Sequence, residues 1–164
     1  MPRYRRFFVP GGCYFFTVVT ADRKPIFADE NNVEHLKQAF KREMERRPFI
    51  LQAIVVLPDH VHALWELPKG DADFSNRWRE IKKHVSKSCG QSVWQKHYWE
   101  HCIRDDDDWA KHLDYIHFNP VRHGYTSSAC EWKWSSFHRW QQQGVYSHGW
   151  GSAEPDRIKG MACE

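Results

Sequence analysis

The distribution of hydrophobic residues near the start of the chain predicts a strand followed by a helix. Residues 13–20 are mostly aromatic or β-branched and follow a turn signal, Gly11-Gly12. Because this run is apolar almost without interruption, it is typical of a central strand buried on both faces. From residue 32 to about residue 47, apolar side chains recur at spacings of three and four, the pattern of an amphipathic helix that ends before Pro48.

A predicted hairpin comes next, and a second amphipathic helix follows it. Residues 49–57 and 60–67 favour two β-strands, and Pro58-Asp59 between them favours a tight turn. After a break around Gly70, apolar residues again recur at helical spacing over residues 73–88. The other faces of this helix are strongly basic.

Patterns in the second half of the chain are less regular. Residues 91–104 are consistent with a further strand or with an irregular aromatic segment, and both interpretations stay open. Four consecutive aspartates, at positions 105–108, then introduce a helix over residues 109–118, since acidic side chains in a first turn interact favourably with the helix dipole. We therefore interpret the acidic run as the start of a helix and not as a carboxylate metal cluster.

At 164 residues the chain has the length of a single domain that can bury a substantial core. Residues 121–125 and 132–138 are expected to form loops and a short element that pack aromatic side chains on the fold. Glycine and scattered charges from residue 147 onward indicate limited order. We therefore expect one domain over residues 1–146 and a poorly ordered tail over residues 147–164.

Basic residues are concentrated in two places although the net charge is small. The chain has 24 Lys and Arg against 21 Asp and Glu, which gives +3 with neutral histidines, so the overall charge indicates little about partners. The N-terminal arm and the helix over residues 73–88 nevertheless carry local clusters that favour a polyanionic partner. These residues are Arg3, Arg5, Arg6, Arg77, Arg79, Lys82, Lys83 and Lys87. A frayed terminus and a solvated helix face explain each of them equally well.

Other features of the composition concern the cellular setting. Aromatic residues make up 15% of the chain, which suits either a small packed core or base stacking. The five cysteines are widely spaced and include no Cys-x-x-Cys pair, so we expect neither a disulfide framework nor a cysteine zinc site. No apolar run is long enough to span a bilayer, and the N-terminus lacks the apolar core of a signal peptide. We expect a soluble, intracellular protein.

Two histidines at the start of the third predicted strand form the first candidate site. Successive side chains of a strand point to opposite faces, so His60 and His62 share one face while Val61 and Ala63 share the other. Two neighbouring imidazoles with room for an oxygen ligand suit a divalent metal ion that keeps positions open for substrate. Taken alone, two strand histidines that are satisfied by hydrogen bonds or by solvent have the same appearance.

A tyrosine and an asparagine near the end of the helix over residues 109–118 add candidate chemistry. At about 100° per residue, Tyr115 and Asn119 project close together at the edge of the apolar stripe. Pro120 disfavours helical geometry for Asn119, so this spacing is approximate. A tyrosine hydroxyl can attack a phosphodiester and store the product as a phosphotyrosine, but it needs a metal ion or a positive field because a neutral phenol is a weak nucleophile.

Several motifs occur in an order that resembles a known family. The first is Pro58-Asp59-His60-Val61-His62, and about fifty residues later comes Asp114-Tyr115-Ile116-His117-Phe118-Asn119-Pro120-Val121-Arg122-His123-Gly124. Shorter matching stretches lie at residues 77–83, 99–101, 103–104 and 134–137. Over roughly residues 4–140 this pattern resembles the single-tyrosine HUH transposases, and within them the REP-associated tyrosine transposases. The specificity lies in the combination, since His-x-His alone is a weak signal.

The resemblance implies an α/β (α+β) fold of the ferredoxin-like sandwich type, whose central antiparallel sheet presents the two histidines beneath a helix bearing the nucleophile. It implies that Tyr115 is that nucleophile and that His60 and His62 bind Mg²⁺ or Mn²⁺, with Asn119 as a third ligand. Members of the family cleave and rejoin single-stranded DNA carrying REP hairpins through a 5′-phosphotyrosine.

We accordingly expect a single-strand DNA endonuclease and strand transferase in the bacterial cytoplasm, associated with the nucleoid. Its two basic clusters are expected to contact the DNA beside and along the hairpin. The resemblance implies a monomer in which Tyr115 acts in cis, and a dimer is also compatible with the sequence.

Two other functions are compatible with the same residues. A non-catalytic protein with this fold and basic surface would bind REP hairpins as an architectural or regulatory factor. A zinc hydrolase or a structural zinc protein would be built on His60 and His62, although apart from Asp59 no nearby cysteine or acid completes such a site. The presence of every expected type of active-site residue favours the enzyme.

Overall fold

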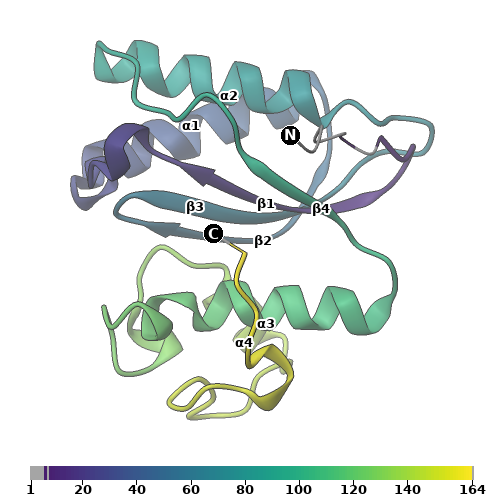
Figure 1. The fold of residues 1–164 in the computed structure, drawn as a ribbon, viewed down its shortest axis with the longest axis vertical. Coiled ribbons are helices and arrows are strands. Elements are labelled where there is room, and N and C mark those ends of the chain that lie inside the picture. The colour runs from purple at the N-terminus through teal and green to yellow at the C-terminus, as the bar shows by residue number, and fades with distance from the viewer. Residues whose placement is uncertain (1–5, 7, 164) are drawn as a thin grey trace, which may run out of the picture.

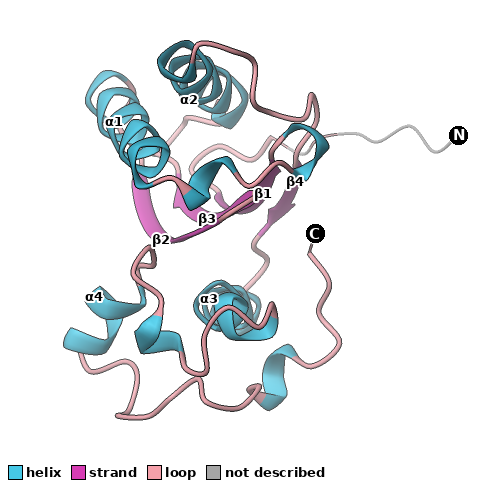
Figure 2. Ribbon diagram, turned by 90° about the vertical axis from the view of Figure 1, so that its left-hand side faces the viewer, coloured by secondary structure: helices cyan, strands magenta, loops and turns pink. Residues whose placement is uncertain are grey.

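The computed structural model describes residue 6 and residues 8–163, and four antiparallel strands form its centre. The strands are β1 (Cys13–Val19), β2 (Ile50–Leu57), β3 (His60–Glu66) and β4 (Trp99–Cys102), in the spatial order β2-β3-β1-β4. The helices are α1 (Glu30–Arg46), α2 (Phe74–Cys89), α3 (Asp106–Arg122) and α4 (Phe137–Gln142). Helices α1 and α2 cover one face of the sheet, and α3 and α4 lie on the other (Figures 1 and 2). This is the predicted α+β sandwich.

The two middle strands, β1 and β3, send alternate side chains into two separate cores. On the face toward α1 and α2, Phe16 and Trp65 pack with Trp78, and the Trp65 and Trp78 ring centroids are 4.6 Å apart. On the face toward α3, Phe15 and Leu64 pack with apolar side chains of that helix. The uninterrupted apolar pattern of β1 therefore reflects burial on both faces, as predicted.

Short polar side chains define where the helices begin. The Asp29 carboxylate accepts a hydrogen bond from the Asn31 backbone N–H at the start of α1. The Asp105 carboxylate accepts one from the Asp108 N–H at 2.8 Å at the start of α3. Each bond satisfies a donor that has no partner within the helix. The interpretation of the acidic run as a helix start is confirmed.

For residues 91–104 the sequence was consistent with either a strand or an irregular segment, and the structure contains one of each. Its last part forms the four-residue strand β4, which pairs with β1 through Thr17↔Trp99 and Tyr14↔Cys102. Its first part is irregular; it forms an isolated bridge with Thr20, the residue after β1, and the Gln95 N–H donates to the Val19 carbonyl at 2.9 Å. β4 is therefore a short edge strand.

All five cysteines are free, as the absence of paired spacings indicated. Among residues 6 and 8–163, no helix combines the length and the apolar character needed to cross a membrane.

Candidate active site

The two histidines lie side by side at the start of β3, directly after the tight turn. His60 pairs with Val19 and His62 pairs with Thr17 on β1, so both imidazoles point to the face that α3 covers. Their ring centroids are 4.8 Å apart, and the residues are only 1% and 0% exposed. His60 and His62 therefore share one face of the sheet, as predicted, and lie at a buried end of the hairpin.

Neighbouring side chains hold both imidazoles through Nδ1. The Asp59 carboxylate lies 2.6 Å from Nδ1 of His60 and 3.2 Å from the Arg23 guanidinium. Burial alone would raise the pKa of Asp59, but the hydrogen bonds from His60 and Arg23 outweigh it and lower the pKa. Because a carboxylate only accepts, Nδ1 of His60 carries the proton. The lone pair of that ring is then on Nε2.

His62 also carries its proton on Nδ1, but here the partner is a hydroxyl and not a carboxylate. Its Nδ1 lies 2.9 Å from the Thr17 hydroxyl, and this hydroxyl donates its hydrogen to the Cys163 carbonyl. The hydroxyl has one hydrogen, so it must accept from Nδ1–H of His62. Such outer partners fix the orientation of metal-binding histidines. The sequence analysis assigned no role to Thr17, since it lies 45 residues from His62.

Tyr115 is a buried residue of α3 whose ring meets that of His62 edge to face. The two ring centroids are 5.4 Å apart, and the Arg122 guanidinium lies 5.1 Å from the centroid of the tyrosine ring. The Tyr115 hydroxyl accepts a hydrogen bond from the Cys163 backbone N–H at 3.3 Å. The structure thus brings the predicted nucleophile next to the histidine pair, with a cation beside it.

Asn119 is also fully buried on α3, one turn after Tyr115. The expectation that Pro120 disturbs the helix at this point is wrong, because α3 continues through it to Arg122. Proline removes only one N–H from the ladder, and the helix ends two residues later, so few bonds are lost. The helical spacing of Tyr115 and Asn119 is consequently regular.

His123 is a residue that the sequence analysis missed. It follows α3, where its backbone N–H donates to the Asn119 carbonyl at 3.0 Å. Its ring centroid lies 5.1 Å from that of His60. A third imidazole is therefore next to the pair, and the only signal in the sequence was its place in the same motif as Tyr115.

The C-terminal segment packs over the candidate site. Ile158 and Cys163 are buried, the Arg122 guanidinium donates to the Met161 carbonyl, and Arg157 lies 3.3 Å from the Asp114 carboxylate. The sequence predicted limited order here from its glycines and charges. The contacts instead involve partners about forty residues earlier in the chain, which no local pattern indicates.

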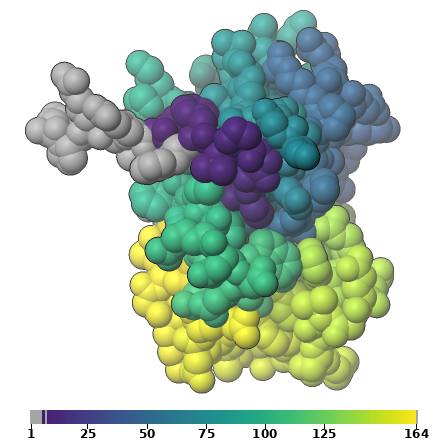
Figure 3. Space-filling model, turned by 90° about the vertical axis from the view of Figure 1, so that its right-hand side faces the viewer, coloured from purple at the N-terminus to yellow at the C-terminus, as the bar shows by residue number. Residues whose placement is uncertain are grey.

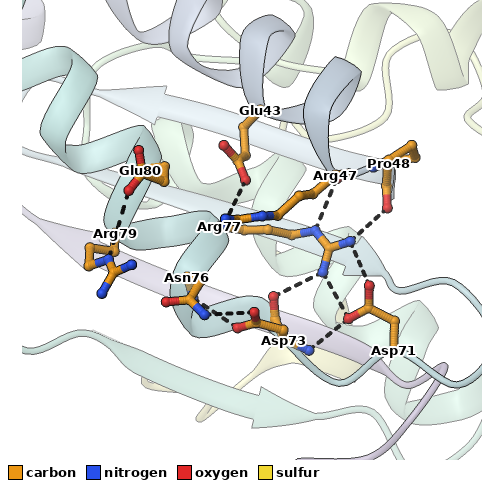
Figure 4. Close-up of polar contacts among 9 residues, drawn as sticks. All are labelled: Glu43, Arg47, Pro48, Asp71, Asp73, Asn76, Arg77, Arg79 and Glu80. Atoms are coloured by element: carbon orange, nitrogen blue, oxygen red, sulfur yellow. Dashed lines mark hydrogen bonds and ion pairs between the residues drawn. The ribbon is translucent and has the colours of Figure 1, made fainter.

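Arg77 does not belong to the basic surface (Figure 4). Its side chain is buried and donates two hydrogen bonds to the Asp71 carboxylate, at 3.0 and 2.8 Å. Three more bonds reach the backbone carbonyls of Arg47, Pro48 and Asp73. This arrangement contradicts the expectation that Arg77 contacts DNA. Its physical role is to join the end of α1 to the loop before α2.

The other basic residues of α2 are accessible to different degrees. Arg79, Lys83 and Lys87 are exposed, whereas the half-buried Lys82 donates from Nζ to the Gln95 carbonyl at 2.8 Å. In the N-terminal arm, Arg6 forms an ion pair with Glu100 at 2.6 Å. Arg3 and Arg5 lie outside the described residues.

A further group of potential ligands joins β4 to α3, away from the histidine pair. His101, Asp108 and His112 place their ligand atoms within 4.8 Å of one another. Hydrogen bonds account for this group, since Asp108 accepts from His101 at 2.8 Å and from the Arg104 N–H at 2.9 Å. Nδ1 of His112 donates to the Asp108 carbonyl at 2.8 Å. The group therefore ties the strand to the first turn of the helix.

Comparison with known proteins places this site in a family. Residues 9–119 match the model of a family described as transposase IS200 like. The chain belongs to the IS200-like transposases. It is 42% identical to a REP-associated tyrosine transposase of Escherichia coli (strain K12) over 157 residues, which cover 95% of this chain and 94% of that protein. The resemblance seen in the motifs of this transposase is therefore confirmed.

Two further comparisons extend over nearly the whole transposase. A Haemophilus influenzae protein that provisionally carries the same name is 39% identical over 175 residues, covering 98% of this chain and 99% of that one. A solved structure of a REP-associated tyrosine transposase bound to a REP hairpin matches with a TM-score of 0.88 at 42% identity, covering 95% of this chain and 94% of that chain. These matches confirm the predicted fold and make this transposase a DNA-processing enzyme.

The family suggests a metal requirement, and the donor set of this transposase fits a divalent ion. Asp59 and Thr17 hold the Nδ1 atoms of the two histidines, so Nε2 is the ligand atom that each ring offers. Asn119 adds an amide oxygen on the facing helix. Imidazole nitrogens bind transition-metal ions and an amide oxygen suits Mg²⁺ and Mn²⁺, so this mixed donor set can hold a divalent ion.

Proposed function

We propose that this protein cleaves and rejoins single-stranded DNA bearing REP hairpins, through a covalent 5′-phosphotyrosine on Tyr115. The observation that carries the proposal is the contact between the Tyr115 ring and the ring of His62 within one chain. The hairpin as substrate is inferred from the relative of known structure, which is bound to a REP hairpin.

His60, His62 and Asn119 would hold Mg²⁺ or Mn²⁺ in this proposal. When bound, the ion supplies a positive charge that polarises a non-bridging phosphate oxygen and offsets the charge that develops in an in-line displacement. Asp59 and Thr17 orient the two imidazoles through Nδ1, so that each ring would bind the ion through Nε2.

In the cleavage step, the Cys163 backbone moves off the Tyr115 hydroxyl, and the tyrosine oxygen then attacks phosphorus and loses its proton to solvent. A new bond forms between phosphorus and the tyrosine oxygen, the bond from phosphorus to the 3′ oxygen breaks, and the leaving 3′ oxygen takes up a proton. Arg122, 5.1 Å from the ring centroid, would offset part of the negative charge that develops around the reacting phosphate. Rejoining is the reverse reaction, in which a 3′ hydroxyl displaces the tyrosine.

The basic residues that remain on the surface are proposed to contact the DNA backbone. Arg79, Lys83 and Lys87 are exposed on α2, and Lys82 and Arg6 lie beside β4. Arg3 and Arg5 stay predictions of the sequence. Phosphate contacts of this kind give affinity and register without reading the base sequence.

Because Tyr115 contacts His62 of its own chain, we propose a monomer that acts in cis. The proposed unit is the predicted domain over residues 1–146, to which the C-terminal segment is attached.

The test is covalent capture of a REP hairpin oligonucleotide in the presence of Mn²⁺. An adduct that survives denaturation is expected for the wild type, and Tyr115→Phe or chelation of the metal should abolish it. Tyr125→Phe, a change at an exposed tyrosine on the loop after α3, is the matched control and should form adduct normally. An undiminished adduct with Phe at position 115 would exclude Tyr115 as nucleophile. Full hairpin binding without cleavage, under any metal or flanking sequence, would instead indicate a non-catalytic hairpin-binding protein.

A further inference from the structure

An apolar groove runs along the outer edge of β2, on the side of the sheet that α1 covers. Side chains between residues 33 and 45 of α1 form one wall, residues of β2 between 51 and 56 form the floor, and side chains between 133 and 139, where α4 begins, form the other wall. The hollow measures about 790 Å³. Figure 2 shows α1 and α4 on opposite sides of the β2 edge, and in Figure 3 the blue surface at the upper right adjoins the lime-green surface of the segment after α3.

The floor and the α1 wall are the margin of the core between α1 and the sheet. Phe40 is buried, whereas Met44, Leu51 and Ile54 keep part of their surface accessible. The apolar side chains of the wall stand at positions 33, 36, 40 and 44, which is the spacing of one helix face. At 1.5 Å per residue this wall is about 16 Å long, or three turns. Accessible apolar surface with a polar border marks an interaction site.

Positive charge borders the groove. Among the described residues that line it, one is acidic, Glu45, and four are basic. The basic rim consists of Lys37, Lys41, Lys133 and Arg139, and all four residues are exposed. Nζ of Lys37 and Nζ of Lys133 lie 4.5 and 4.4 Å from the centroid of the Trp134 ring. Lys133 also pairs with Glu30 at 3.1 Å, but the two side chains are 66% and 69% exposed, so this ion pair is weak.

An apolar floor inside a basic rim distinguishes between classes of partner. A nucleic-acid backbone presents charged phosphates, which gain nothing from contact with apolar side chains. The Trp134 ring already contacts two ammonium groups, so it is a poor platform for a base. An amphipathic helix presents apolar side chains along three turns, with polar side chains on both flanks. Such a helix matches the length of the α1 wall, and carboxylates on its flanks match the charge of the rim.

We propose that this groove binds an acidic amphipathic α-helix of a protein partner. Apolar side chains of that helix pack on Met44, Leu51 and Ile54, and its flanking carboxylates pair with the basic rim. His60 and His62 point to the opposite face of the sheet, so the bound helix leaves the candidate active site accessible. The groove is therefore a docking surface that is separate from the proposed chemistry.

Fluorescence anisotropy of a labelled synthetic peptide tests the proposal. The probe is a helix of about 18 residues, with leucines on one face and glutamates on both flanks of that face, and its control is a peptide of the same composition in scrambled order. The wild type should bind the probe at least about 10-fold more tightly than the scrambled peptide. Lys41→Glu should weaken binding of the probe about 5- to 30-fold, because repulsion replaces an attractive pair. Arg42→Glu makes the same change one residue along, facing a different hollow between α1 and α2, and should stay within about twofold of the wild type.

Two further measurements locate the bound peptide. Met44→Glu puts a charge on the apolar surface and should weaken binding of the probe at least about 10-fold, while formation of the covalent DNA adduct stays unchanged. A benzophenone group on the apolar face of the probe should cross-link to residues 33–56 or 133–139 of the wild type, and this result does not depend on the folding of any variant.

Three results would overturn the proposal. The first is equal affinity of the wild type for the probe and the scrambled peptide. The second is equal weakening of probe binding by Lys41→Glu and Arg42→Glu. The third is displacement of the probe by a duplex oligonucleotide together with cross-links outside the groove, which would assign the peptide to a DNA-binding surface.

Discussion

The two arginines of α2 that the sequence treats alike should respond differently to substitution. Arg77 is buried and donates five hydrogen bonds, two to Asp71 and three to backbone carbonyls. The exposed Arg79 has its Nε 3.9 Å from Glu80, a distance at which the ion pair is weak. We predict that Arg77→Met strongly destabilises the protein, whereas Arg79→Met leaves the free energy of unfolding within about 0.5 kcal/mol of the wild type.

The magnitude follows from the bonds that methionine cannot make. Five hydrogen bonds at a net value of about 1 kcal/mol each set a scale of about 5 kcal/mol. The Asp71 side chain is 32% exposed, so water replaces part of its two bonds, and the methionine side chain keeps some apolar packing. We expect a net loss of about 3 kcal/mol, at the lower end of the range for breaking a buried ion pair.

Urea unfolding at neutral pH measures this loss. With a slope of about 2 kcal/mol per M, the midpoint of Arg77→Met should fall by about 1.5 M. The hydrogen bond from Arg77 lowers the pKa of Asp71 below 3.8. The stabilisation that comes from the Arg77–Asp71 contact is therefore fully present above about pH 4 and is lost as the pH falls through the lowered pKa. The difference in the free energy of unfolding between the wild type and Arg77→Met should therefore become smaller in acid. A midpoint unchanged by Arg77→Met would refute the reasoning.

Three further predictions concern the site and the C-terminal segment. Thr17→Val removes the acceptor that orients His62, so the Mn²⁺ dissociation constant should rise about 10- to 100-fold in a titration followed by electron paramagnetic resonance, and unchanged affinity would contradict this role. Deleting residues 161–164 removes the backbone that covers the Tyr115 hydroxyl and should speed single-turnover adduct formation; an equal or slower rate argues against that cover. Gly151→Ala should destabilise the protein by about 1–3 kcal/mol more than Gly149→Ala, because both have positive φ but only at Gly151 would a Cβ meet Ala129, at 2.7 Å. Equal effects in urea unfolding would show that the segment does not pack as described.

Local sequence patterns determined the helices and strands, and they placed the histidine pair of the candidate site on one face of a strand. The strand and helix periods are set by which side chains each element buries, and the resulting elements agree with the structure to within a few residues, apart from α3. The period of two in a strand was enough to put His60 and His62 on one face. The acidic cap of α3 was likewise visible, because helix capping involves residues only three positions apart.

Only the tertiary structure decided how these elements meet. Arg77 and Arg79 are two residues apart on one basic helix, but the packing of α1 against α2 buries the first and leaves the second exposed. The contacts of Thr17 with His62 and of Cys163 with Tyr115 join residues 45 and 48 positions apart. Which polar groups satisfy one another across such distances depends on strand order and register, which are properties of the assembled sheet. The sequence alone therefore determined that a histidine pair and a tyrosine were present, and the fold decided which residues orient, cover and adjoin them.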